Sequence, residues 1–188
     1  RGHIHESDNG ILLFPYTIRN HVTSSFSTLA AALEMRVELL NHQRDFYKEA
    51  AKEATAAAGE AYLVGGIKDQ ARVYHLMEML NRHNIKAYHL GKQVTQSGVT
   101  YRTENSYIVP LNQPQHRLLK AIFDVRTSFR DSLFYDVSAW TMPYAFNIPF
   151  HHLKGKSLDS KLLGSQFKPE DVPQGSVDNQ SPLAYIIP

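Results

Sequence analysis

Histidine and glutamate lie three residues apart at two places in the sequence, which is a spacing found among zinc ligands. His3 and Glu6 form one H-x-x-E pair, and His75 and Glu78 form the other. On a helix, residues i and i+3 share a face, so both side chains of a pair could reach one ion. A catalytic zinc usually needs three protein ligands. We therefore predict no metal site, with a site built from His3, His5, Glu6 and a distant residue as the alternative.

A glycine pair follows an apolar stretch in "AYLVGG", where a phosphate-binding loop could begin. Neither G-x-G-x-x-G nor G-x-x-x-x-G-K-[ST] continues from it, so dinucleotide and P-loop sites are not predicted. No G-x-S-x-G elbow occurs, and the chain has no Cys to serve as a nucleophile or a thiolate ligand. The remaining expectation is a small-ligand site near Gly65, Gly66 and Asn112, at the carboxyl ends of neighbouring strands.

Composition excludes several classes of protein. The 188 residues are 43% hydrophobic, which is enough for a core, and the formal net charge is only +2. Basic residues are scattered, so no nucleic-acid surface is indicated. No apolar run approaches the ~20 residues of a membrane-spanning helix. We therefore expect no nucleic-acid partner and no membrane span.

The first third of the chain predicts one strand followed by one helix. The stretch "ILLFPYTI" at 11–18 is apolar, with Pro15 placing an irregularity or an edge within it. Apolar residues then recur at three- and four-residue steps, which predicts a single amphipathic helix over 25–57. The residues expected to pack this helix are Phe26, Leu29, Leu33 and Leu40.

The clearest pattern is strand, helix and strand within about 30 residues. Strands are predicted at 61–65 and 86–90, joined by a helix over 68–85. Such a unit is typical of adjacent parallel strands with a right-handed crossover. The predicted inner face of the helix holds Val73, Leu76, Met77 and Leu80. The fold class expected is therefore α/β, with a small parallel sheet of Rossmann-like or amidotransferase-like type preceded by a strand and a long helix.

Later segments are less regular. A helix is predicted over 116–124 and a short one over 136–146, broken near Pro143. The polar, Gly- and Pro-containing stretch 151–181 is typical of a linker or surface excursion. The ending "LAYIIP" is similar to "AYLVGG" and is interpreted as the beginning of a further strand, although short apolar strands also look alike by chance. The chain is on this view a fragment.

Three phrases resemble a group of large bacterial zinc carboxypeptidase-like proteins related to carboxypeptidase A. They are "HESDNGILLFPYTIRNHVTSSFSTLAAALEMR", "YIVPLNQPQHRLLKAIFD" and "FRDSLFYDVSAWTMPYAFNI". In that group a metallopeptidase domain precedes an α/β region similar to class I glutamine amidotransferase-like domains. The resemblance implies that 1–57 end the peptidase domain, that 60–150 form the following domain, and that 151–188 hold a linker and the next strand.

The same resemblance implies that this chain lacks the family's chemistry. The zinc ligands of the family lie upstream of the region that the chain matches. The catalytic Glu of the last strand is replaced by Thr17, or by Arg19 if the match is shifted by two residues. Neither side chain is a useful proton acceptor for zinc-bound water. The amidotransferase-like elbow reads "VGGIKD" and has no Cys.

Two hypotheses about function follow. In the first, the chain is a non-catalytic accessory region of a zinc metallocarboxypeptidase-like protein, secreted or periplasmic by resemblance, with the upstream peptidase domain as its partner and zinc only in the parent. In the second, it is an independent α/β enzyme or small-ligand-binding domain with a site at the strand ends. A homodimer that buries the apolar helix face is a further possibility.

Overall fold

The chain forms two compact units, residues 1–49 and 50–188. The structure is a computed structural model that describes residues 4–8, 10–125, 127–128, 141–155 and 158–175. No helix among these residues combines the length and the apolarity that crossing a membrane requires.

The N-terminal unit is a small hairpin followed by helix. Strands β1 (Ile4–Ser7) and β2 (Gly10–Leu13) pair antiparallel, and α1 (Phe14–Glu34) begins directly after them. The predicted strand over 11–18 is therefore wrong beyond Leu13. Pro15 lies in the first turn of α1, where its missing N–H costs nothing and its fixed φ suits the helix.

The predicted single helix over 25–57 is also wrong, because it is two helices. The first, α1, ends at Glu34, and α2 (Arg36–Ala56) begins after Met35. The packing expected for this segment is not found. Every side chain of α1 is exposed, and Leu33, for example, is 75% exposed.

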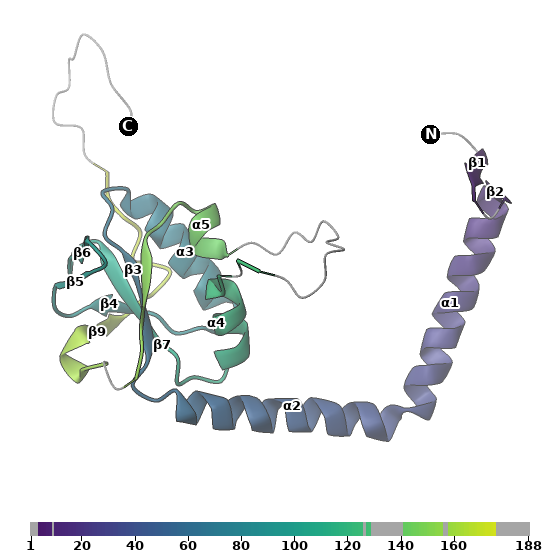
Figure 1. The fold of residues 1–188 in the computed structure, drawn as a ribbon, viewed down its shortest axis with the longest axis horizontal. Helices are drawn as coiled ribbons and strands as arrows, with labels where there is room; N and C mark the ends of the chain where they lie inside the picture. The colour runs from purple at the N-terminus through teal and green to yellow at the C-terminus, as the bar shows by residue number, and fades with distance from the viewer. Residues whose placement is uncertain (1–3, 9, 126, 129–140, 156–157, 176–188) are drawn as a thin grey trace, which may run out of the picture. The chain divides into compact units, whose positions relative to one another are not determined.

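The second unit is built on a five-stranded sheet with the order β8-β3-β7-β4-β9 (Figure 1). Its strands are β3 (Ala61–Gly65), β4 (Tyr88–Leu90), β7 (Ser106–Pro110), β8 (Phe150–Leu153) and β9 (Leu163–Gln166). Every neighbouring pair in this sheet is antiparallel. The unit is thus a mixed α/β structure, and the predicted parallel sheet is wrong.

The error comes from the strand that lies between the two predicted neighbours. The strands β3 and β4 do not pair with each other, because β7 pairs antiparallel with both of them. The two strands therefore run in the same direction, as the β3–α3–β4 crossover requires, but a later strand separates them. This arrangement is a split βαβ unit. The second predicted strand also begins later, at Tyr88 rather than Lys86.

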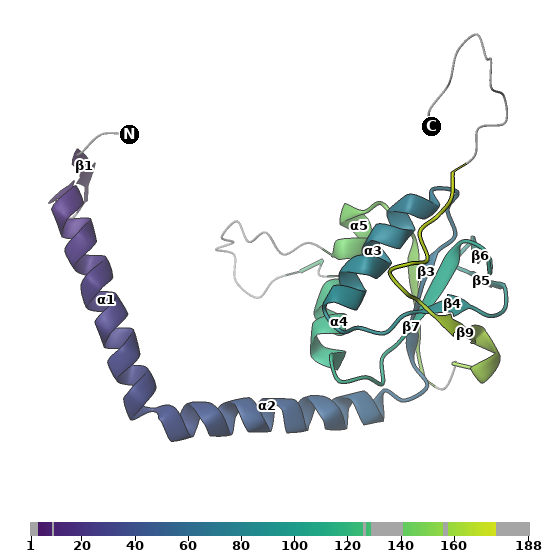
Figure 2. The same ribbon diagram turned by 180° about the vertical axis from the view of Figure 1, so that it is seen from behind.

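Both faces of the sheet are covered. Side chains of Tyr62, Val64, Tyr107 and Val109 join a core with α3 (Gln70–Arg82) and α4 (His116–Phe123). The alternate residues Leu63 and Ile108 face a second core, closed by the hairpin of β5 (Val94–Gln96) and β6 (Val99–Tyr101). Figures 1 and 2 both show the sheet between the helices on one side and this hairpin on the other.

The helix predicted over 68–85 is confirmed as α3. Its four predicted inner residues are all buried. Asp69 caps it, because its side chain accepts a hydrogen bond of 3.1 Å from the backbone N–H of Arg72. The helix predicted over 116–124 is confirmed as α4, whose buried residues are His116, Leu119 and Phe123.

The linker predicted over 151–181 is partly wrong. The strand β8 pairs with β3, and β9 pairs with β4, with the 3-10 turn η1 (Ser160–Leu162) just before β9. Both strands are therefore part of the main sheet. The short helix expected over 136–146 is found as α5 (Met142–Ala145), with Pro143 in its first turn; residues 136–140 lie outside the described residues. The strand predicted at "LAYIIP" also lies outside them.

We predict that truncating a core leucine and an exposed leucine of α1 will have very different effects. Leu76 is fully buried on α3, so Leu76→Ala should lower the free energy of unfolding by about 2–5 kcal/mol. Leu33→Ala removes the same atoms from an exposed site and should change it by less than ~0.5 kcal/mol. Urea unfolding of both variants measures the difference. Equal losses would contradict the burial described here.

Candidate ligand-binding groove

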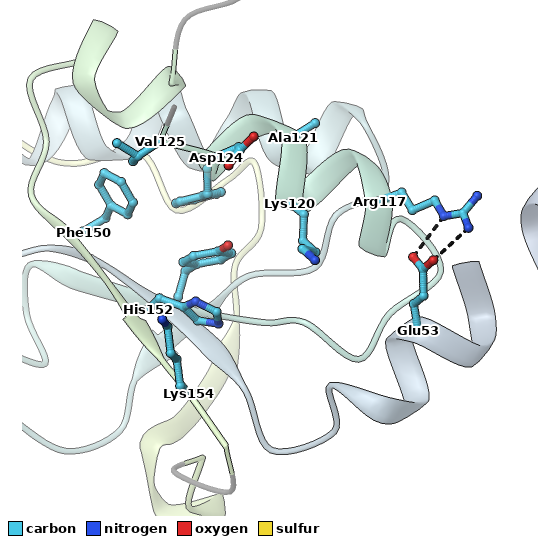
Figure 3. A pocket seen from close by; sticks show the side chains of 11 residues that line it. Glu53, Arg117, Lys120, Ala121, Asp124, Val125, Phe150, His152 and Lys154 are labelled. Carbon is cyan, nitrogen blue, oxygen red and sulfur yellow. Dashed lines mark hydrogen bonds and ion pairs between the residues drawn. The ribbon is translucent and has the colours of Figure 1, made fainter. Parts of the chain in front are cut away.

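A groove of about 670 Å³ lies between α4 and β8, within the second unit (Figure 3). It mixes charged side chains with aromatic and aliphatic ones, and it is open to solvent on one side. Its lining residues are Glu53, Tyr62, Arg117, Lys120, Ala121, Phe123, Asp124, Val125, Phe150, His152 and Lys154. A volume of this size is typical of sites for small ligands or short peptides.

Aromatic rings form one part of the lining. The rings of Tyr62 and Phe123 stack at 4.3 Å between centroids, and Phe150 meets Phe123 edge-on at 5.6 Å. The His152 ring lies 4.7 Å from that of Tyr62. The register explains this grouping, because Tyr62 of β3 is directly opposite His152 of β8, and Phe150 is two residues away on the same face.

The hydroxyl of Tyr62 is neutral in this setting. Its side chain is only 6% exposed, and burial raises the pKa of its hydroxyl. The negative charges of Asp124 and Glu60 raise that pKa further. The phenol therefore remains protonated at neutral pH, because its ordinary pKa of about 10 is already high.

The charged wall of the groove is organised by α4. Arg117 donates two hydrogen bonds to Glu53, from Nε at 3.0 Å and from Nη2 at 2.8 Å. This guanidinium lowers the pKa of the Glu53 carboxyl. Glu53 is 48% exposed, so solvent screens the attraction between the two charges. Lys120 lies one turn further along α4 and points into the groove (Figure 3).

The His152 ring is oriented by the carboxylate of Glu60. Its Nε2 lies 2.9 Å from a carboxylate oxygen of Glu60, the residue just before β3. Both side chains are partly buried. A His–carboxylate pair can hold a fixed tautomer and exchange a proton, but a nucleophile or a bound water would have to complete a catalytic centre.

The described residues do not bring together a metal site. None of their His, Asp and Glu side chains form a group of three that could hold an ion. His75 and Glu78 do approach each other, at 3.5 Å on α3, but Glu78 also accepts a hydrogen bond of 2.6 Å from Arg82, which lowers the pKa of its carboxyl. His3 lies outside the described residues. The prediction that the chain holds no metal stays a prediction.

The structure does not bring together the three residues of the expected small-ligand site, Gly65, Gly66 and Asn112. Gly65 ends β3 opposite Ser106, whereas Asn112 follows the other end of β7, where Pro110 pairs with Ala61. Four residue steps along a strand separate these ends by about 13 Å. The hypothesis required the carboxyl ends of both strands to lie at the same end of the sheet. Antiparallel pairing places them at opposite ends.

Gly65 and Gly66 instead allow close packing after β3. Both have positive φ, at +123° and +75°. A Cβ on Gly65 would collide with the carbonyl oxygen of Asn105 and lie 2.8 Å from the Cα of Ser106. The N–H of Gly66 donates to the Ser106 hydroxyl at 3.1 Å. These glycines therefore shape a turn rather than a phosphate loop.

Thr17 and Arg19 lie on α1, not on a strand. The expected match to the last strand of a peptidase domain therefore falls on helical residues in this structure. The Arg19 guanidinium carbon lies 5.3 Å above the ring centroid of Tyr16, which is a cation–π contact along the helix.

Sequence reasoning missed the groove because it assigned 151–181 to a linker. One signal was present in "PFHHL", where Phe150 and His152 alternate with His151 after a proline, as in a short strand. The contribution of α4 could be expected from its amphipathic pattern. Its position opposite Phe150 could not, because that contact joins segments about 30 residues apart.

We predict that Gly65→Ala will destabilise the second unit by about 1–3 kcal/mol, since it adds both a collision and an unfavourable backbone conformation. Gly98→Ala is the matched control. Gly98 also has positive φ, at +79°, but a Cβ there would meet nothing within 4 Å. Thermal unfolding should show the larger loss for Gly65→Ala. A larger loss for Gly98→Ala would contradict the packing described.

No family model matches this chain, and neither does any curated protein or solved structure to which it was compared. The resemblance to zinc carboxypeptidase-like proteins therefore rests on the three sequence phrases.

Proposed function

We propose that this chain is a non-catalytic accessory region of a zinc metallocarboxypeptidase-like protein, and that its helical arm packs on the rest of the peptidase domain, of which 1–57 would form the last part. The arm is defined here as α1 together with residues 36–49 of α2. The observation that carries the proposal is the exposed apolar surface of the arm. The protein would act in peptide hydrolysis outside the cytoplasm, with zinc bound by the peptidase domain.

The apolar residues of the arm follow a helical stripe. Val22, Phe26, Leu29 and Leu33 recur at steps of four, three and four residues, which places them on one face of α1. All four side chains are at least half exposed. A contiguous row of large exposed apolar side chains is typical of a surface that another protein surface covers. The family resemblance names that surface as the upstream peptidase domain.

The residue chemistry supports an accessory role rather than a catalytic one. Thr17 and Arg19 cannot serve as the general base that the family uses, because neither accepts a proton at neutral pH. The sequence has no Cys, so a thiol nucleophile at the strand-to-helix turn is not possible. The second candidate function, a small-ligand-binding domain, is favoured by the groove between α4 and β8.

We predict that Leu33→Asp will weaken binding of the arm to the peptidase domain without unfolding the second unit. An aspartate at the C-terminal end of the apolar stripe would be desolvated in the complex, and about tenfold weaker binding is expected. Ser24→Asp is the matched control, because it adds the same charge on the opposite face of α1. Affinity can be measured by calorimetry with the separately produced peptidase domain.

Unchanged affinity for Leu33→Asp would contradict docking through this face. Size-exclusion chromatography of the chain alone tests the remaining possibility, which is a homodimer. A homodimer that Leu33→Asp dissociates and Ser24→Asp leaves intact would assign the stripe to self-association instead of to the peptidase domain.

We further predict that this chain alone contains no stoichiometric zinc and hydrolyses no C-terminal peptide bond. The family's zinc ligands lie upstream of the matched region, and an H-x-x-E pair supplies only two of the three protein ligands usually needed. Metal analysis of untagged protein and a carboxypeptidase assay measure both properties. One zinc per chain, lost together with activity in Glu6→Gln, would overturn the non-catalytic proposal.

A further inference from the structure

The strand β8 lies at an edge of the main sheet. Within the part of the chain that the structure describes, its strand partner is β3 on one side only. An edge strand presents a row of main-chain N–H and C=O groups that another extended chain can pair with. The edge at β8 differs from an ordinary one because a groove opens directly beside it.

The register identifies which main-chain groups point outward. The N–H of Gly65 donates to the carbonyl of Pro149 at 3.1 Å, and Leu63 lies directly opposite His151. In an antiparallel pair, hydrogen-bonded positions alternate along the strand. Residues 149 and 151 therefore bond toward β3, and the N–H and C=O groups of Phe150 and His152 point to the outer edge.

The side chains of the same two residues line the groove. Phe150 and His152 are two positions apart on one strand, so both side chains lie on the helix-facing side of the sheet. Figure 3 shows both of them on β8, with Lys120 extending from α4 on the other side of the groove. Outward main-chain groups and groove-lining side chains thus belong to the same pair of residues.

We propose that the outer edge of β8 and the adjoining groove together bind an extended peptide, which adds to the sheet as a further antiparallel strand and places alternate side chains in the groove. This is recognition by strand addition, in which main-chain hydrogen bonds give affinity and side-chain pockets give specificity. The inference is independent of the proposed function of the arm.

The groove indicates the chemistry of the peptide. A side chain opposite Phe150 would contact that ring and the apolar Val125, which favours an aliphatic residue. A side chain opposite His152 would lie toward Lys154 and Lys120, which favours Asp or Glu. Charge complementarity supports this choice, because the cationic side chains of Lys120 and Lys154 line the same groove as His152.

Antiparallel addition sets the order of these residues. The peptide would run opposite to β8, so it would meet His152 before Phe150. The acidic residue must therefore precede the aliphatic one by two positions, with the intervening side chain on the other face of the sheet. The motif is Glu-x-Ile or a close equivalent, and the partner is a protein segment that presents it in extended form.

The probe is the peptide acetyl-Ser-Thr-Glu-Thr-Ile-Thr-Ser-amide, titrated into the ¹⁵N-labelled full chain. We expect saturable binding, with the largest amide shifts at Phe150 and His152. Methylating the backbone nitrogen of the Ile should weaken binding about fivefold or more, because that N–H would bond to β8. Methylating the central Thr is the matched control, since its N–H would point away from β8, and affinity should be retained.

Charge reversal on the protein tests the side-chain part of the proposal. Lys120→Glu and Lys154→Glu should each weaken binding about fivefold, and added salt should weaken binding to the unchanged chain. Lys92→Glu makes the same charge change at an exposed site outside the groove and should have no effect. Replacing the Glu of the peptide by Lys should lower the affinity further.

Three outcomes would overturn the proposal. One is no saturable binding of the probe. A second is equal loss on methylating the Ile and the central Thr, which would show that main-chain pairing at β8 is not used. A third is binding that Lys120→Glu and Lys154→Glu leave unchanged, with amide shifts elsewhere, such as along α1. That result would locate peptide binding on another surface.

Discussion

The antiparallel pairing of β3 with β7 is the constraint on which the second unit depends. Ala61, Leu63 and Val64 of β3 and Ile108 of β7 are fully buried, so both strands have apolar neighbours on each face. A strand in this position needs cover from two sides. The helices α3 and α4 provide it on one face, and the β5–β6 hairpin provides it on the other. The remaining strands join the edges of this pair.

The groove is a consequence of that pairing. Because β8 adds to the free side of β3, the His152 side chain lies opposite Tyr62, on the face that α4 also contacts. The aromatic rings fill the space near the sheet, and the longer charged side chains of Arg117 and Lys120 reach out from α4. A sheet edge beside this groove is the basis of the strand addition that we propose.

The arm and the second unit differ in whether their apolar side chains are buried. In the second unit the apolar side chains of α3 are buried against the sheet. In the arm, equally large side chains such as Phe26 and Leu29 are exposed. The hydrophobic effect favours covering such a stripe, at roughly 25 cal/mol for each Å² removed from water. We therefore propose a separate interaction for each unit, one through an apolar helix face and one through a sheet edge.

The sequence by itself determined the local elements whose periodicity is strong. The four buried positions of α3 and the extent of α4 follow from a 3.6-residue repeat, which depends only on residues close in the chain. The mixed α/β class follows from the same patterns. The expected ligand site was not determined in this way, because Gly65 and Asn112 were grouped by assuming parallel strands.

Strand direction, strand order and the groove were decided only by the tertiary structure. An apolar run such as "AYLVG" records that both faces of a strand are buried, which is usual in parallel sheets but is equally satisfied here by helices and a hairpin around antiparallel strands. The insertion of β7 between β3 and β4 depends on contacts more than 15 residues apart in the chain. Periodicity carries no record of such contacts, because their free energy arises only when the distant segments pack together.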